Sequence, residues 1–136
     1  MDGTLLNTRH QITPRTRAAL AHLHERGVPF VVISARSPHR LGQLSVVKSS
    51  DILLEIMADG ITKATALQTL CGLWQADPRD CYAFGDNYND AEMLALVGHP
   101  FLMGNAPAPL KTRISSHTAD NDHDGIAVPL EGAGMV

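Results

Sequence analysis

Apolar residues fall along the chain in short continuous runs separated by stretches with helical spacing. The continuous runs cover residues 28–33, 51–57, 81–84 and 100–103. Short runs rich in β-branched or aromatic residues are typical of buried strands. Helical spacing recurs at residues 18–23, 66–74 and 91–97. Helices that alternate with apolar strands predict an α/β fold with a Rossmann-like, doubly wound parallel sheet.

Local signals set several element boundaries. A Thr-Pro pair at 13–14 predicts a helix start, with Thr as the N-cap and Pro at the first helical position. Gly27 predicts the end of that helix. Residues 37–50 are polar and irregular, with only a weak apolar thread. Two short helical or turn segments are expected toward the C-terminus, at 110–114 and 125–130.

Composition narrows the possible partners. The 136 residues suffice for one domain, 1–136, with a core of its own. The formal net charge is −3, and no basic patch or acidic tail appears, so no nucleic-acid partner is expected. No apolar run approaches the roughly 20 residues that span a bilayer, so no membrane partner is expected either. Cys71 and Cys81 lie in apolar settings outside any CxxC pair, which favours reduced thiols in a cytoplasmic protein.

Candidate chemistry centres on the loop that follows the apolar run 81–84. Asp86, Asn89 and Asp90 lie on this predicted strand-to-helix turn. In an open α/β sheet, ligands bind at the carboxyl ends of the strands, and clustered carboxylates there suit Mg²⁺. The alternative is a solvated turn in which Asp90 only caps the next helix.

Three further segments place polar residues at strand ends or helix starts. Asp2 and Gly3 lie at the N-terminus, Ser34 follows the run 28–33, and Lys63 lies at a helix start. Each has a simple structural explanation when taken alone. Together they supply the groups that phosphoryl transfer requires. These are cations that offset the charge of the phosphate, hydrogen-bond donors to its oxygens, and a carboxylate that transfers a proton.

Six ordered motifs resemble those of the haloacid dehalogenase superfamily of phosphatases, and more narrowly its Cof-type sugar-phosphate phosphatases. They lie at residues 2–6, 31–36, 60–67, 84–94, 103–106 and 121–127. The resemblance covers nearly the whole chain. It implies hydrolysis of a phosphomonoester through an aspartyl-phosphate, with a small phosphorylated metabolite as substrate.

The resemblance also assigns roles residue by residue. Asp2 matches the general acid/base of the family, and Ser34 with Ala35 matches the segment that binds the phosphoryl oxygens. Lys63 matches the lysine that neutralises the phosphate and holds the carboxylates together. Asn89 is expected near the phosphate or the metal shell.

The same resemblance implies Mg²⁺ as the cofactor. Asp86 matches the direct metal ligand, and Asp90 is expected to act through water or in support. The backbone carbonyl of Asp2 is the third expected ligand.

The sequence departs from the family pattern in two ways, and the first lowers the phosphatase activity expected of these residues. The family motif reads Asp-x-Asp-Gly-Thr, and its first Asp is the nucleophile. Here Met1 takes the x position, so the nucleophile and the central strand that carries it fall before the first residue. The 136 residues are therefore expected to be nearly inactive, as a truncated enzyme or as a degenerate phosphate- or metal-binding module, unless another segment fills the slot.

The second departure is the cap domain that Cof-type proteins insert between the Ser and Lys motifs. Only a short stretch fills that interval here, and residues 37–50 are interpreted as the remnant of the insertion. The sequence therefore predicts a core domain with an absent or vestigial cap. An uncapped site and an open sheet position both make a homo-oligomer plausible.

Overall fold

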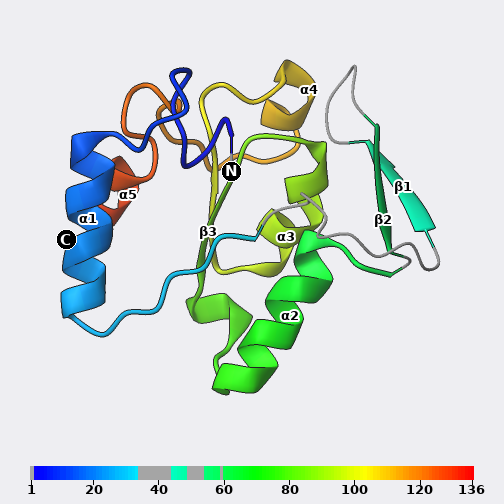
Figure 1. The fold of residues 1–136 in the computed structure, drawn as a ribbon, viewed down its shortest axis with the longest axis horizontal. Coiled ribbons are helices and arrows are strands. Elements are labelled where there is room, and N and C mark those ends of the chain that lie inside the picture. The colour runs from blue at the N-terminus through cyan, green and yellow to red at the C-terminus, as the bar shows by residue number, and fades with distance from the viewer. Residues whose placement is uncertain (1, 34–43, 49–53, 59) are drawn as a thin grey trace.

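A computed structural model describes residues 2–33, 44–48, 54–58 and 60–136. The helices and strands follow one another along the chain as shown in Figure 1. They are α1 (Pro14–Glu25), β1 (Leu44–Lys48), β2 (Leu54–Ala58), α2 (Lys63–Trp74), β3 (Tyr82–Gly85), α3 (Ala91–Leu96), β4 (His99–Leu102), α4 (Ala108–Lys111) and α5 (Ala127–Gly132). Single 3₁₀ turns cover Pro78–Asp80 and Tyr88–Asp90. No helix in these described ranges has the length and apolar character to cross a membrane.

The central sheet is built on β3 and β4, which run parallel with Phe84 opposite Phe101. The other two strands, β1 and β2, form an antiparallel pair of their own, which lies beside the main body in Figure 1. The predicted α/β class with a parallel sheet is thus confirmed. The register of β3 and β4 brings their carboxyl ends to the same edge.

Side chains of β3 alternate between two apolar clusters. Ala83 packs into the cluster of α3, β4 and α4, where Leu94, Leu102 and Leu110 are almost completely buried. Tyr82 and Phe84 face the opposite cluster, which is formed with Leu23 of α1 and the residues of α5. Helices therefore cover both faces of the sheet, as a doubly wound arrangement requires.

The first helix begins where the sequence predicts. Thr13 is the N-cap, its hydroxyl oxygen accepts a hydrogen bond from the Thr16 N–H, and Pro14 is the first helical residue. The helix ends at Glu25 and is followed by Gly27 with a φ of +71°. At α2, Thr62 and Thr65 form a reciprocal capping box, which fixes Lys63 as the first residue of that helix.

The expected buried strand at residues 28–33 is wrong. These residues adopt no strand, and Phe30, Val31 and Val32 are 44% to 50% exposed. A strand needs lateral hydrogen bonds, and in the described part of the chain β3 pairs with β4 and with no second neighbour. The run is apolar enough to form a buried strand. Within the described residues, however, it has no neighbouring strand to pair with.

The stretch read as irregular, residues 37–50, contains a strand. Leu44–Lys48 pairs with Leu54–Ala58, from Leu44 opposite Ala58 to Lys48 opposite Leu54. Of the interpreted cap remnant, 37–50, only residues 44–48 are described, so its origin as a remnant stays a prediction.

Candidate active site

The site is built at the carboxyl end of β3, where Asp86 follows the strand directly. The Thr4 hydroxyl donates a hydrogen bond to Oδ1 of Asp86. This contact joins the N-terminal motif to the acidic loop across 82 positions of sequence. Two of the predicted segments are therefore in contact.

Gly3 makes this approach possible. Its φ is +76°, and a Cβ atom there would collide with the Asp86 carboxylate. Glycine adopts this left-handed conformation at little cost and leaves room for the carboxylate. The Asn105 side-chain amide donates a hydrogen bond of 2.8 Å to the Gly3 carbonyl oxygen, which holds the turn in place.

Lys63 and Asp90 form the second link between predicted segments. The Lys63 ammonium, at the start of α2, contacts Oδ1 of Asp90. Their side chains are only 10% and 3% exposed, so the pair is shielded from water. A shielded pair of this kind is held in one geometry more firmly than a surface pair.

The second carboxylate oxygen of Asp90 organises the loop backbone. It accepts hydrogen bonds from the backbone N–H groups of Asp86, at 2.9 Å, and Asn87, at 3.0 Å. Gly85 is needed beside it, since a Cβ atom at that position would collide with the Asp90 side chain. Both oxygens of Asp90 are thus engaged by protein groups, which suits a supporting role.

Asp86 is the carboxylate whose environment favours a cation. Burial raises the pKa of Asp86 above its ordinary value, and the neighbouring Asp90 raises it further, while the Thr4 hydrogen bond and Lys63 act in the opposite direction. A cation beside Asp86 would offset the cost of keeping this group ionised.

The Asp86 carboxylate offers the kind of oxygen ligand that Mg²⁺ takes in proteins. Within residues 2–33, 44–48, 54–58 and 60–136, no three His, Cys, Asp or Glu side chains are grouped to form a protein cage for a metal. Mg²⁺ does not require one, because it commonly binds one or two carboxylates and keeps waters or phosphate oxygens as its other ligands. A single carboxylate such as that of Asp86 fits this pattern.

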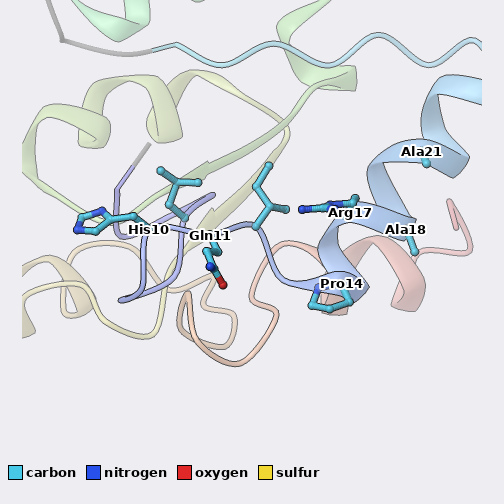
Figure 2. Close-up of a pocket in the computed structure, with 8 residues that line it drawn as sticks. His10, Gln11, Pro14, Arg17, Ala18 and Ala21 are labelled. Carbon is cyan, nitrogen blue, oxygen red and sulfur yellow. The ribbon is translucent and has the colours of Figure 1, made fainter.

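Asp2 directly precedes Gly3 and Thr4, the two residues that approach Asp86. The Asp2 carboxylate is 42% exposed and comes within 3.8 Å of Nδ1 of His10. His10 also lines a hollow of about 840 Å³ between the loop before α1 and the helix itself. Figure 2 shows Gln11 on the loop side of this hollow and Arg17 on the helix side. Asp2 therefore lies beside a residue that lines this hollow.

Residues 120–124, which overlap the C-terminal motif 121–127, clamp the N-terminal loop, a role that the sequence did not reveal. The Asn121 side-chain amide donates a hydrogen bond of 2.8 Å to the Leu6 carbonyl oxygen. The Thr8 N–H and hydroxyl both donate to Asp122 at 2.9 Å. The spacing of 114 positions between Thr8 and Asp122 leaves no local pattern from which this contact could be inferred.

The remaining predicted residues are placed as follows. Ser34 and Ala35 lie outside the described residues. Asn89 lies half-buried on the turn between Asp86 and α3. Cys71 and Cys81 are free thiols, as predicted.

Comparison with known proteins gives the family. The model of the haloacid dehalogenase-like hydrolases matches residues 1–45 and 38–130 of this chain. The match extends over nearly the whole sequence, and the chain belongs to that family. The recognition made from the six motifs is confirmed.

Individual relatives agree with this assignment. A Haemophilus influenzae protein provisionally named a phosphatase is 33% identical over 135 residues, which cover 80% of this chain and 52% of that protein. The 5-amino-6-(5-phospho-D-ribitylamino)uracil phosphatase of Bacillus subtilis is 33% identical over 85 residues, or 62% of this chain and 30% of the enzyme. A haloacid dehalogenase-like hydrolase from Bacteroides thetaiotaomicron superposes with a TM-score of 0.58 at 34% identity, covering 66% of this chain and 34% of its own. The chain spans about half of the first relative and less of the others.

Proposed function

We propose that the chain acts in the Mg²⁺-dependent hydrolysis of a phosphomonoester, a sugar phosphate or a similar small phosphorylated metabolite. The observation that carries the proposal is the pair of contacts Thr4–Asp86 and Lys63–Asp90. They bring three sequence motifs together at the carboxyl end of β3. The name of the B. subtilis relative, a phosphatase acting on a phosphorylated ribityl compound, supports the substrate class.

In the proposed mechanism, Asp2 moves the proton. It gives a proton to the oxygen of the departing alcohol and takes one from the water that later attacks the aspartyl-phosphate. Lys63 offsets the negative charge of the phosphoryl oxygens. Ser34, Ala35 and Asn89 are proposed to donate hydrogen bonds to these oxygens. The attacking carboxylate is assigned to no described residue.

Asp86 and the backbone carbonyl of Asp2 would hold Mg²⁺, with Asp90 in support. When bound, the ion neutralises charge on the phosphoryl group. The hollow beside His10 is where we place the organic part of the substrate. We assign the protein to the cytoplasm because its two cysteines are free thiols.

A second candidate function is a module that binds phosphate or a metal without hydrolysing a substrate. It is favoured by the same contacts, because Lys63, Asp86 and Asp90 can bind ligands without a nucleophile. The two candidates share a site and differ in whether a covalent step occurs.

Hydrolysis of a chromogenic phosphate ester, measured with Mg²⁺ and with a chelator, tests the proposal. The expected result is slow Mg²⁺-dependent turnover that is lost in Asp86→Asn and retained in Glu92→Gln, a matched change at an exposed carboxylate of α3. Binding of Mg²⁺ and inorganic phosphate by a folded sample without turnover would favour the binding module. A folded sample that neither binds nor turns over would contradict both.

A further inference from the structure

Two cysteines lie in contact at the amino end of β3. The Sγ atoms of Cys71 and Cys81 are 3.8 Å apart. Cys71 is buried near the end of α2, whereas Cys81 directly precedes β3 and is only partly buried. The 136 residues hold no other cysteine. Each thiol therefore has the other as its one possible disulfide partner among these residues.

Backbone hydrogen bonds hold both cysteines in place. The Ala76 N–H donates to the Cys71 carbonyl oxygen at 2.9 Å, where the chain leaves α2. The Cys81 N–H donates to the Pro78 carbonyl oxygen at 3.0 Å, and the Cys81 thiol donates to the Asp77 carbonyl oxygen at 3.6 Å. The contact between the two sulfur atoms is therefore fixed by the connection that joins α2 to β3.

A disulfide at this place requires only a small movement. Bonded sulfur atoms are about 2.05 Å apart, so the two Sγ atoms must approach by about 1.8 Å from their present positions. Gly72, which follows Cys71, has open space where a Cβ atom would lie. The side chain of Leu73 is exposed beside it. The end of α2 therefore has room to move toward β3.

The thiol pair and the ion pair of the candidate site lie at opposite ends of the same helix (Figure 1). Lys63, the first residue of α2, contacts Asp90 beyond the carboxyl end of β3. Cys71 meets Cys81 at the amino end of the strand. A covalent bond between the thiols would therefore fasten the second end of α2 to the strand that leads into Asp86.

We propose that Cys71 and Cys81 are a redox-active pair that forms a reversible disulfide, with a small-molecule disulfide such as oxidised glutathione as the oxidant. The Cys81 thiolate attacks one sulfur of the oxidant and releases half of it as a thiolate, which leaves a mixed disulfide on Cys81. The Cys71 thiol gives its proton to solvent, attacks the Cys81 sulfur and releases the second half. The two protein thiols thus lose two electrons, and one molecule of oxidant is reduced to two thiols.

Such a pair is reduced at rest and is oxidised when the thiol pool becomes more oxidising, as in redox-sensing proteins of the cytosol. The proposal goes beyond the phosphate site, and it stands whether or not Asp86 binds Mg²⁺.

Equilibration in a series of glutathione redox buffers tests the proposal. Arg79 lies between the two cysteines, so trypsin separates their peptides unless a disulfide joins them. Mass spectrometry of acid-quenched samples then measures the joined fraction. Half-oxidation of the folded chain is expected at a ratio of oxidised glutathione to the square of reduced glutathione at least about tenfold lower than for the chain in urea, because folding holds the two sulfur atoms together. The oxidised chain should consequently unfold at a higher denaturant concentration than the reduced chain.

The rate of oxidation has a predicted pH dependence. Burial raises the pKa of the Cys81 thiol to about 11, and the neighbouring Cys71 raises it further. The reactive thiolate is therefore scarce at neutral pH, and oxidation of the folded chain should be about tenfold faster for each unit by which pH rises from about 7 to about 9.

Two variants serve as matched controls. Cys71→Ala and Cys81→Ala each remove one partner, so neither should gain resistance to denaturant in the oxidising buffer. If either variant fails to fold, the comparison of the folded and unfolded unmodified chain decides the matter. A folded chain that is oxidised no more readily than the chain in urea would overturn the proposal. Mixed disulfides with glutathione, without joined peptides, would overturn it as well.

Discussion

Lys63 and Asp90 form an ion pair that ties the start of α2 to the turn after β3, with both side chains at most 10% exposed. The same Asp90 carboxylate accepts two backbone N–H groups of the acidic loop. One pair therefore holds a helix, a loop and, through that loop, the position of Asp86.

Removing the cation should leave Asp90 buried and poorly compensated. Lys63→Met is expected to lower the free energy of unfolding by about 3 kcal/mol, since breaking a shielded pair from one side costs more than the pair contributes. The double variant Lys63→Met, Asp90→Asn should recover part of this loss. Denaturant unfolding measures both, with Arg113→Met as a control at an exposed cation. Equal stability of the wild type and Lys63→Met would show that the pair is not shielded as described.

The close approach of Gly3 to Asp86 predicts a position-specific effect of alanine. Gly3→Ala should cost about 1–2 kcal/mol from its left-handed backbone and more from the collision with the carboxylate. Gly27 has a similar φ of +71° with open space around it, so Gly27→Ala should show the backbone cost alone. Only Gly3→Ala is expected to weaken Mg²⁺ binding as well. If the two variants behave alike in unfolding and in Mg²⁺ titration, the contact with Asp86 is not as described.

The clamp at residues 120–124 should matter to the site although it lies outside it. Asn121→Ala removes the hydrogen bond to the Leu6 carbonyl and should cost about 1 kcal/mol. Because that bond fixes the loop that carries Thr4, phosphate affinity should fall too. Gln68→Ala, at an exposed position of α2, is the control for both measurements. If Asn121→Ala lowers stability but leaves phosphate affinity unchanged, the clamp does not help to position the site.

The environment of Asp86 predicts a pH dependence with a definite sign. Burial raises the pKa of Asp86 above 3.8, so the folded state holds this proton more tightly than the unfolded chain does. Stability from this group is therefore present at low pH and is lost as pH rises through the raised pKa. In chelator, the wild type should lose stability relative to Asp86→Asn as pH increases from about 4 toward neutrality. A difference that is constant with pH, or that changes in the opposite direction, would contradict the assigned environment.

Local chemistry made part of the fold predictable. The capped start of α1 at Thr13 depends on neighbouring residues, as does the strand-to-turn change at Gly85, and both were found from the sequence. The run 28–33 was misread because burial of a strand depends on what lies beside it, and periodicity carries no such information. Contacts such as Asn121 with Leu6 join residues more than a hundred positions apart, so no spacing rule could indicate them.

The candidate site was likewise predictable where it depends on local sequence, and not where it depends on contacts between distant residues. Asp86 and Lys63 could be singled out because each stands where a strand ends or a helix begins. Their motifs were recognised by resemblance, and the family is confirmed. The different roles of the two carboxylates could not be predicted from the sequence. Only the structure shows that Asp86 accepts a hydrogen bond from the Thr4 hydroxyl, whereas both oxygens of Asp90 are bound by protein groups.

The central claim is that Asp86 binds Mg²⁺ at the carboxyl end of β3, and calorimetric titration of Mg²⁺ in the presence of inorganic phosphate tests it most directly. The wild type and Glu92→Gln should bind the ion with the same affinity, whereas Asp86→Asn should show no binding and no loss of stability in chelator. Mg²⁺ affinity that survives Asp86→Asn would contradict the account.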